Sequence, residues 1–428
     1  MQAAFPSFFR SFTASDFFVD LPFWAELAVI VVVYRLLPPQ RAAKEVALLA
    51  CSIGMLLVLP RFDLKALAMF VALCAGTYGC GRLLNGGQTF QSPRARRALA
   101  TAGVLLIVFV LAFFKYTFVQ RLFLPGKSFP ASAGTQVFFL MGISYSSFKA
   151  MHFVIESYKK SIKEWSFLTF LNYMLFFPSF MSGPINRYNH FCQHSALARN
   201  SPLAEDLRGG LERIIHGLFK KTVLTVILLP WTLPQLRTPL AEMSWSQVVL
   251  GLYAYALYFY LDFSGYTDLA IGTARLLGFG LPENFNYPFL KKNIQQLWVN
   301  WHISLTSWLT DYLYWPLVRR GWTYKCLQQR PALLSYLAIV VTFLVCGAWH
   351  GNTLSFLFWG LYHGLGIVTV NQYQRWKRQT RSARLRRYFA SGFSRGWGAV
   401  LTFNYYAAGL VLFTLEWPQV KVLLRHLL

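Results

Sequence analysis

The chain has 428 residues, of which 55% are hydrophobic and only 13% charged, and its mean hydropathy is +0.40. Soluble domains carry about a quarter charged residues, so the composition excludes an ordinary soluble protein and indicates a surface that faces lipid. The formal net charge is +25. It does not indicate nucleic-acid binding, because the basic residues stand in short gaps between apolar segments, as charges that set membrane topology do.

The first residues, 1–22, are rich in Phe and contain one cation, Arg10. They lack a basic start and a cleavage site of small residues, so we do not expect a cleaved signal peptide. We expect this segment to lie along the membrane interface before the first span.

Apolar segments that could cross ~30 Å of hydrocarbon, which takes about 20 residues, recur along the whole chain. They lie near 23–37, 44–59, 64–82, 98–119, 134–155, 166–182, 211–233, 246–277, 296–318, 332–349, 353–371 and 397–415. Several are short or interrupted, so we expect roughly 10–12 transmembrane or re-entrant helices. No internal repeat, linker or soluble domain interrupts them, and we predict a single all-α integral membrane domain over 1–428.

The cysteines give no sign of a disulfide framework. Most of the six lie in apolar runs without a C-x-x-C pair, where a free thiol behaves as a small hydrophobe. The stretch His190-x-Cys192-x-His194 has residues that can bind zinc, but a fourth ligand is not evident. We therefore predict no metal site and no tightly bound cofactor.

The orientation of the C-terminal half follows from its basic loops. The segment from Asn371 to Gly396 carries eight cations and no acid, which predicts a cytoplasmic loop. Further cations stand at 82–97 and at 319–330. The 332–349 helix would then run outwards and 353–371 would return, placing His350 toward the outer half of the membrane.

Ionisable side chains at membrane depth cost several kcal/mol unless they are paired or hydrated, so each is a candidate for function. The densest set is in the C-terminal half and comprises Asp262, Asp268, His302, Asp311, His350 and His363.

His350 ends an apolar helix and is followed by a glycine, which lets a substrate come close. A neutral imidazole can take the proton of a hydroxyl that attacks a thioester. His302 follows Trp301 in a run of helically spaced tryptophans. Taken alone, each histidine fits a structural role better: His350 hydrogen-bonded at a helix end, and His302 packed among the aromatic rings.

Two other patterns stay open on the residues alone. The segment 262–268 holds two carboxylates and three hydroxyls, which suits either a functional site or a buried hydrogen-bond network at a helix break. Cys346 and His350 are four residues apart and could form a nucleophile pair. Because buried free cysteines are common, we assign Cys346 to packing.

The order of several motifs resembles the membrane-bound O-acyltransferase (MBOAT) family. The motifs are Phe176-Phe-Pro178, Ser182-Gly-Pro-Ile-Asn-Arg-Tyr188, Asp262-Phe-Ser-Gly-Tyr-Thr-Asp268, Pro282-Glu-Asn-Phe-Asn-Tyr-Pro288, Trp298-x-x-Trp-His302-Ile-Ser-Leu305, Trp308, Asp311-Tyr-Leu-Tyr314 and Trp349-His350-Gly351. They span about 176–364, whereas roughly the first 130 residues match the family in hydropathy alone. Within the family, the chain is similar to the bacterial alginate O-acetylation and teichoic-acid D-alanylation membrane subunits, without separating the two.

This resemblance implies that His350 and His302 are catalytic. It further implies substrate contacts from five residues in or beside the motifs: Trp301, Asp311, Trp349, Ser264 and Asp268. His363 falls where alginate-type members often have His-Gly. Two departures, Thr310 for an arginine and Val299-Asn300 for a basic pair, put in doubt the contacts that those cations make elsewhere.

The resemblance also implies a fold and a reaction. The helices would form a ring around a thinned core with a tunnel. A cytoplasmic thioester donor, acetyl-CoA or an acyl carrier protein, would give an acetyl or D-alanyl-like group to a hydroxyl of an extracytoplasmic cell-surface polymer or relay partner. His350 would be the base, and an indole N–H or the His302 ring would stabilise the oxyanion. The protein would sit in the lipids of the bacterial cytoplasmic (inner) membrane.

Two other classes remain open. A transporter or flippase also buries polar residues and breaks its helices, and it would keep working without His350. A non-catalytic membrane scaffold would leave the clustered His and Asp residues unexplained.

Overall fold

The computed structural model describes residues 21–58, 64–86, 92–116, 119, 122–123, 134–236 and 238–427. Over these residues the backbone is helical, with one isolated bridge between Phe285 and Trp301 and no strand. The predicted all-α class is confirmed. The predicted interfacial segment 1–22 lies, except for its last two residues, outside the described residues.

The described chain forms two compact units that alternate along the sequence. The N-terminal unit takes the chain up to Phe219 together with Gly265–Pro282. The C-terminal unit takes Lys220–Ser264 and Glu283–Leu428. Helix α13 (Trp245–Leu276) begins in the C-terminal unit and ends in the N-terminal one.

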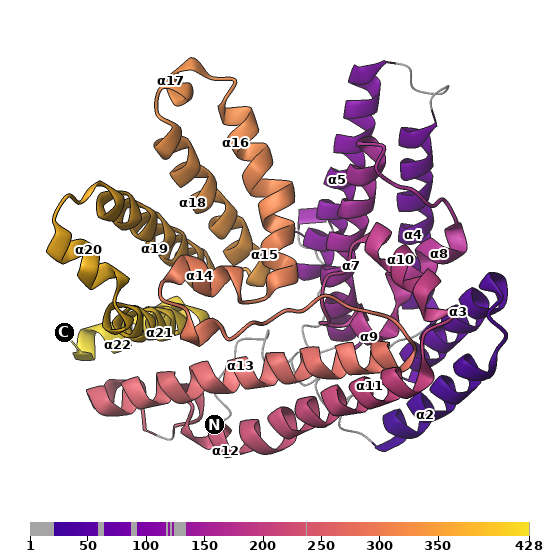
Figure 1. Ribbon diagram of the computed structural model, residues 1–428, viewed down its shortest axis with the longest axis horizontal. Coiled ribbons are helices and arrows are strands. Elements are labelled where there is room, and N and C mark those ends of the chain that lie inside the picture. The colour runs from indigo at the N-terminus through magenta and orange to yellow at the C-terminus, as the bar shows by residue number, and fades with distance from the viewer. Residues whose placement is uncertain are drawn as a thin grey trace. The chain divides into compact units, whose positions relative to one another are not determined.

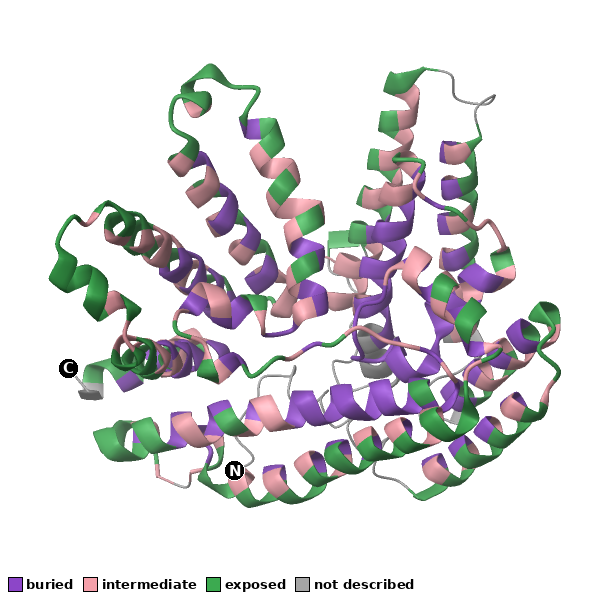
Figure 2. Ribbon diagram, in the orientation of Figure 1, coloured by how far each residue is buried: buried purple, intermediate pink, exposed green. Residues whose placement is uncertain are grey.

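The N-terminal unit is built from helices of very different length. They are α2 (Leu21–Leu36), α3 (Arg41–Val58), α4 (Leu64–Asn85), α5 (Pro93–Lys115), α7 (Gly134–Tyr158), α8 (Phe167–Leu175), α9 (Phe177–Phe180), α10 (Tyr188–Ala198) and α11 (Leu203–Leu218). Helices α4, α5 and α7 pack against one another (Figure 1). On α5 Ile107 is the only buried residue, and several apolar side chains are exposed, Leu105 at 61% among them (Figure 2). An apolar exposed surface of this kind is expected where a helix faces lipid.

Glycines bring α11 directly against the C-terminal part of α13. A Cβ atom on Gly217 would lie 2.8 Å from the carbonyl oxygen of Gly265, and one on Gly272 would lie 2.7 Å from that of Gly210. Small residues allow such close approach between membrane helices. Beside this contact the Arg213 guanidinium and the Asp268 carboxylate lie 2.7 Å apart.

The predicted span 166–182 is wrong as one helix, because the chain breaks at Phe176 between α8 and α9. Two residues of α7 hold the broken segment. The buried Lys149 ammonium donates to the Tyr173 carbonyl at 3.2 Å and to the Ser179 hydroxyl at 3.3 Å. The Nε2 atom of His152 accepts from the Tyr188 amide at 3.0 Å. The Phe176–Tyr188 motifs therefore sit in a buried, hydrogen-bonded turn.

The described part of the C-terminal unit has short helices around three long ones, α18, α19 and α21. They are a π-helix η2 (Phe219–Leu224), α12 (Thr225–Leu228), η3 (Leu229–Trp231), η4 (Leu233–Gln235), η5 (Leu240–Glu242), η6 (Pro288–Leu290), α14 (Ile294–Val299), α15 (Ile303–Leu309), the π-helix η7 (Thr310–Tyr314), α16 (Trp315–Gly321), α17 (Lys325–Gln328), α18 (Pro331–His350), α19 (Leu354–Gln379), α20 (Ala383–Ala390), α21 (Gly392–Thr414) and α22 (Trp417–Leu427).

Helices α18 and α19 form the most extensive contact in this unit. A Cβ atom on Gly347 would lie 2.2 Å from the Phe356 carbonyl oxygen, and one on Gly360 would lie 2.3 Å from that of Phe343. Neither site has room for a methyl group. The pair is therefore held backbone to backbone, which fixes the end of α18, where His350 stands.

Two predictions for the C-terminal half are wrong. The predicted span 296–318 is a succession of short pieces, α14, α15, η7 and α16. The predicted loop 371–396 is mostly helical, since α19 continues to Gln379 and α20 follows. Within the described residues, seven helices are long and apolar enough to cross a membrane. The ring of helices with a tunnel stays a prediction.

Candidate active site

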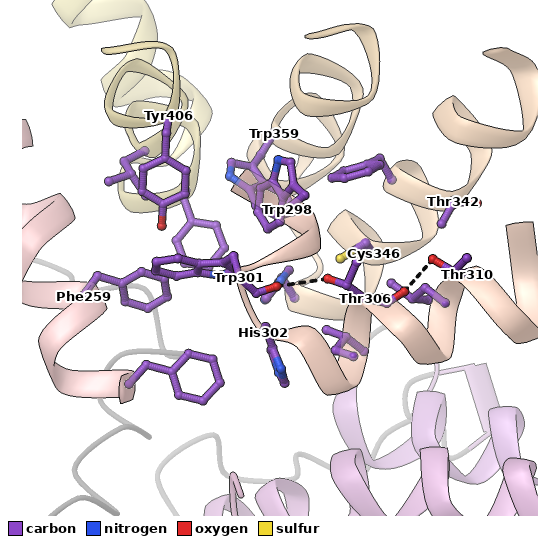
Figure 3. A pocket seen from close by; sticks show the side chains of 17 residues that line it. Phe259, Trp298, Trp301, His302, Thr306, Thr310, Thr342, Cys346, Trp359 and Tyr406 are labelled. Carbon is purple, nitrogen blue, oxygen red and sulfur yellow. Dashed lines mark hydrogen bonds between the residues drawn. The ribbon is translucent and has the colours of Figure 1, made fainter. Parts of the chain in front are cut away.

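A cavity of about 90 Å³ lies inside the C-terminal unit (Figure 3). Its walls come from α13, α14, α15, α18, α19 and α21. The lining residues are mostly aromatic and aliphatic: Phe259, Phe263, Trp298, Trp301, His302, Leu305, Thr306, Leu309, Thr310, Thr342, Phe343, Cys346, His350, Trp359, Tyr406, Leu410 and Phe413. Among the described residues, no Asp, Glu, Lys or Arg lines this cavity.

His302 is buried at the start of α15 in an unusual backbone conformation, with φ 44° and ψ 54°. This left-handed region is disfavoured for residues other than glycine and persists only where the surroundings hold it. The Ile303 amide donates to the carbonyl oxygen of Asn284 at 3.0 Å, and the Asn286 amide donates to that of Asn300 at 3.1 Å. These bonds tie the His302 turn to the 284–286 segment.

The side chain of Asn284 determines which nitrogen of His302 carries the proton. Asn284 Oδ1 accepts from the backbone amide of Ser304 at 3.2 Å, so this atom is the carboxamide oxygen and not the nitrogen. His302 Nδ1 lies 3.3 Å from the same oxygen and must therefore donate to it. The Nε2 atom of the neutral ring is then a hydrogen-bond acceptor.

His350 reaches the cavity as the last residue of α18 and is half-buried. Its ring meets Trp359 and Phe413 edge-on, with centroids 5.1 Å away in both cases. His302 and His350 come from different helices and line the same cavity. The sequence could not show that these two histidines share a cavity.

The other predicted substrate contacts divide into two groups. Trp301 lines the cavity, packed against Phe259 and Tyr406. The remaining four lie outside the lining. Trp349 packs on the ring of His350, Asp311 is exposed in η7, and Ser264 is buried near the Leu261 carbonyl. Asp268 belongs to the N-terminal unit, paired with Arg213.

Asp262 is also engaged in an ion pair. Its carboxylate lies 2.5 Å from the Lys221 ammonium, and both side chains are almost fully buried. Asp262 stands on α13 between Phe259 and Phe263, which both line the cavity. Lys221 lies in the π-helix η2. The Asp262–Asp268 motif therefore forms part of two ion-pair contacts between helices.

Several lining residues carry no polar signal in the sequence. In the sequence, ordinary packing residues of apolar spans look the same as these lining residues, which we did not predict as site residues: Phe259, Trp359, Tyr406 and Phe413. Cys346, which we assigned to packing, lines the cavity as well.

No group of three or more His, Cys, Asp or Glu suited to a metal ion occurs among the described residues. The rings of His190 and His194 on α10 lie 4.3 Å apart, and His194 Nδ1 accepts from the Gly280 amide at 3.2 Å. Burial lowers the pKa of both imidazoles. The absence of a metal site stays a prediction.

The chain is similar to known acyltransferases. The model of the family described as MBOAT, membrane-bound O-acyltransferase family, matches residues 62–410. The teichoic acid D-alanyltransferase of Streptococcus thermophilus is 30% identical over 294 residues, which cover 67% of this chain and 71% of that protein. That of Bacillus subtilis is 32% identical over 241 residues, or 56% and 60% of the two chains.

A second group of relatives is named for a different activity. The probable alginate O-acetylase AlgI of Azotobacter vinelandii is 31% identical over 308 residues, which cover 71% of this chain and 59% of that protein. The match thus spans less than two thirds of this relative and of the Bacillus subtilis one. Matches to both groups confirm the resemblance that the motifs predicted.

Proposed function

Since the chain belongs to the membrane-bound O-acyltransferase family, a family of acyl-transferring enzymes, we propose that it moves an acetyl group from a thioester to a hydroxyl inside the cavity of the C-terminal unit. The observation that carries this proposal is that His302 and His350 line the same cavity. The donor would be acetyl-CoA or an acetylated carrier protein on the cytoplasmic side. The acceptor would be a cell-surface polymer or a relay partner outside the bacterial cytoplasmic membrane.

His350 acts as the general base in this reaction. As the acceptor oxygen attacks the thioester carbonyl, His350 takes its proton, the C–O bond forms and the C–S bond breaks. The proton then passes from His350 to the departing thiolate. Proton transfer by a positioned side chain typically contributes about 10²–10⁴-fold to the rate.

His302 has a different part in the same reaction. With Nδ1 held as a donor by Asn284, its Nε2 accepts a hydrogen bond. It therefore orients a group that donates a hydrogen bond, such as the hydroxyl of the acyl acceptor before attack. In this tautomer Nε2 has no proton and does not stabilise the oxyanion. A fixed orientation of this kind lowers the entropic part of the barrier.

The size and polarity of the cavity favour acetyl over D-alanyl. A cavity of about 150 Å³ holds one benzene molecule, so about 90 Å³ suits an acetyl group and excludes a long acyl chain. A D-alanyl group carries an ammonium. Burying that charge costs several kcal/mol unless a carboxylate pairs with it, and no carboxylate lines the cavity among the described residues.

Membranes that contain the protein test this proposal directly. Labelled acetyl-CoA should transfer its acetyl group to an envelope acceptor with the natural chain and not with His350→Ala, at equal protein amounts. A D-alanyl carrier thioester should give little transfer. If cells with His350→Ala behaved like cells with the natural chain although no acyl group was transferred, the protein would instead be a transporter.

A further inference from the structure

His363 is fully buried on α19 and does not line the cavity, yet it touches the residues that do. Its ring meets Trp298 at a centroid distance of 5.0 Å and Trp359 at 4.9 Å, edge-on in both cases. It also lies 6.2 Å from the ring of Tyr406. His363 thus packs against three aromatic side chains of the cavity wall, Trp298, Trp359 and Tyr406, which Figure 3 labels.

His363 also packs against the backbone of α21. A Cβ atom on Gly409 of α21 would lie 2.7 Å from His363 Nε2, so the backbone of α21 closes the space there. Next to it, the rings of Tyr362 and Tyr405 stack at 4.2 Å. Each of these tyrosines donates its hydroxyl to the other's carbonyl, at 2.9 and 2.6 Å, which locks α19 to α21. His363 is therefore packed between the α21 backbone at Gly409 and the rings of Tyr362 and Tyr405.

The indoles in front of His363 are held by packing and not by hydrogen bonds. The Nε1 atoms of Trp298 and Trp359 are buried without a hydrogen-bond partner among the described residues, and so are both ring nitrogens of His363. The position of each indole is then set by the rings around it. His363 is a packing partner that both indoles share.

We propose that His363 is a positioning residue that limits the length of the acyl chain, because it holds Trp298 and Trp359 against the cavity from behind. The inference rests on the proposed transfer of an acyl group inside this cavity. A smaller residue at 363 would let either indole tilt backwards and would lengthen the cavity. In a hydrophobic pocket one methylene changes discrimination by about 10–200-fold, so a small movement has a measurable effect.

The test compares acetyl-CoA with butyryl-CoA as labelled donors, using the full-length protein in membranes with their own acceptor. The natural chain should use acetyl and almost no butyryl. His363→Ala should raise the ratio of butyryl to acetyl transfer at least about 10-fold. His363→Phe, which keeps a ring in place, should retain acetyl preference. His216→Ala, at an exposed histidine of α11, is the matched control and should change neither donor.

If His363→Ala does not accumulate in membranes, His363→Leu carries the test and should give an intermediate ratio. Equal loss of both donors with an unchanged ratio would reduce His363 to a general folding role and overturn the inference. The inference would also be overturned if His363→Phe transferred acetyl as poorly as His363→Ala, because the ring nitrogens and not the ring volume would then be required. If the natural protein transferred no acyl group from either thioester, the proposed function itself would be wrong.

Discussion

Asn284 and His302 are joined by a hydrogen bond from the imidazole Nδ1 to the carboxamide oxygen, 3.3 Å long and fully buried. The same oxygen accepts from the amide and the hydroxyl of Ser304. This side chain thus fixes the tautomer of His302, and its bond from the Ser304 amide adds to the backbone bonds that hold the left-handed turn. A residue outside the cavity wall determines what a residue inside it can do.

Replacing Asn284 with Leu should lower acyl transfer strongly, because His302 loses the acceptor that fixes its tautomer and the turn loses the bond from the Ser304 amide. We expect a loss of about 10–100-fold, as for other residues that orient a functional histidine. Initial rates at several donor concentrations check this. Ser304→Ala removes one bond to Asn284 and leaves the His302 bond, so its rate should fall much less. Equal rates for Asn284→Leu and the natural chain would show that the tautomer is irrelevant.

Replacing His350 should abolish turnover while the protein still inserts and binds donor. We expect His350→Ala to lose at least about 10²–10⁴-fold. His350→Gln should do no better, because an amide cannot accept the proton. Labelled acyl transfer at matched protein amounts is the measurement.

Cys346→Ala is the informative companion variant, since this thiol lines the same cavity. We expect it to remain active, in keeping with direct attack by the acceptor hydroxyl. An inactive Cys346→Ala together with a labelled acyl-cysteine would replace that route by a covalent one.

Removing one partner of the buried Lys221–Asp262 pair should destabilise the protein. Breaking a buried pair leaves an uncompensated charge and costs about 3–5 kcal/mol. Lys221→Met and Asp262→Leu alone should therefore lower the unfolding temperature in detergent, and the double variant should recover most of it.

The pair of Lys159 and Glu156, whose lysine is exposed, provides the comparison for that experiment. Exposed ion pairs contribute about 0–1 kcal/mol, so Lys159→Met should leave the unfolding temperature nearly unchanged. If Asp262→Leu were as harmless as Lys159→Met, the buried pair would not hold α13 in place.

The basic segment around α20 should face the cytoplasm. Ser382, the exposed first residue before α20, is a suitable position for a cysteine. In intact cells a membrane-permeant thiol reagent should label Ser382→Cys and an impermeant one should not. Ready labelling by the impermeant reagent would reverse the predicted orientation and place His350 toward the inner side.

Uniformly apolar helices could be predicted from the sequence, and broken ones could not. The span 332–349 agrees with α18 to within a residue, because nothing but hydropathy is needed to define it. The span 296–318 failed, although Trp298, Trp301 and Leu305 have helical spacing. The break at His302 depends on hydrogen bonds from the 284–286 segment, which no local pattern reveals.

The candidate site was predictable only where polarity marks it. His302 and His350 stand out as imidazoles in apolar surroundings, and both line the cavity. Asp268 stands out in the same way, yet it is engaged with Arg213. Trp359 and Tyr406 have no such mark, because an aromatic wall and an aromatic core look alike in sequence.

The buried Lys149 bears on how the chain enters the membrane during synthesis. An unpaired lysine near the middle of a helix opposes insertion by about 2.5–3.5 kcal/mol. The ammonium of Lys149 finds its acceptors on Tyr173 and Ser179, which emerge later from the ribosome. Helix α7 is therefore a poor membrane span by itself. The acceptors that satisfy its lysine become available only after the α8 and α9 segments have been made.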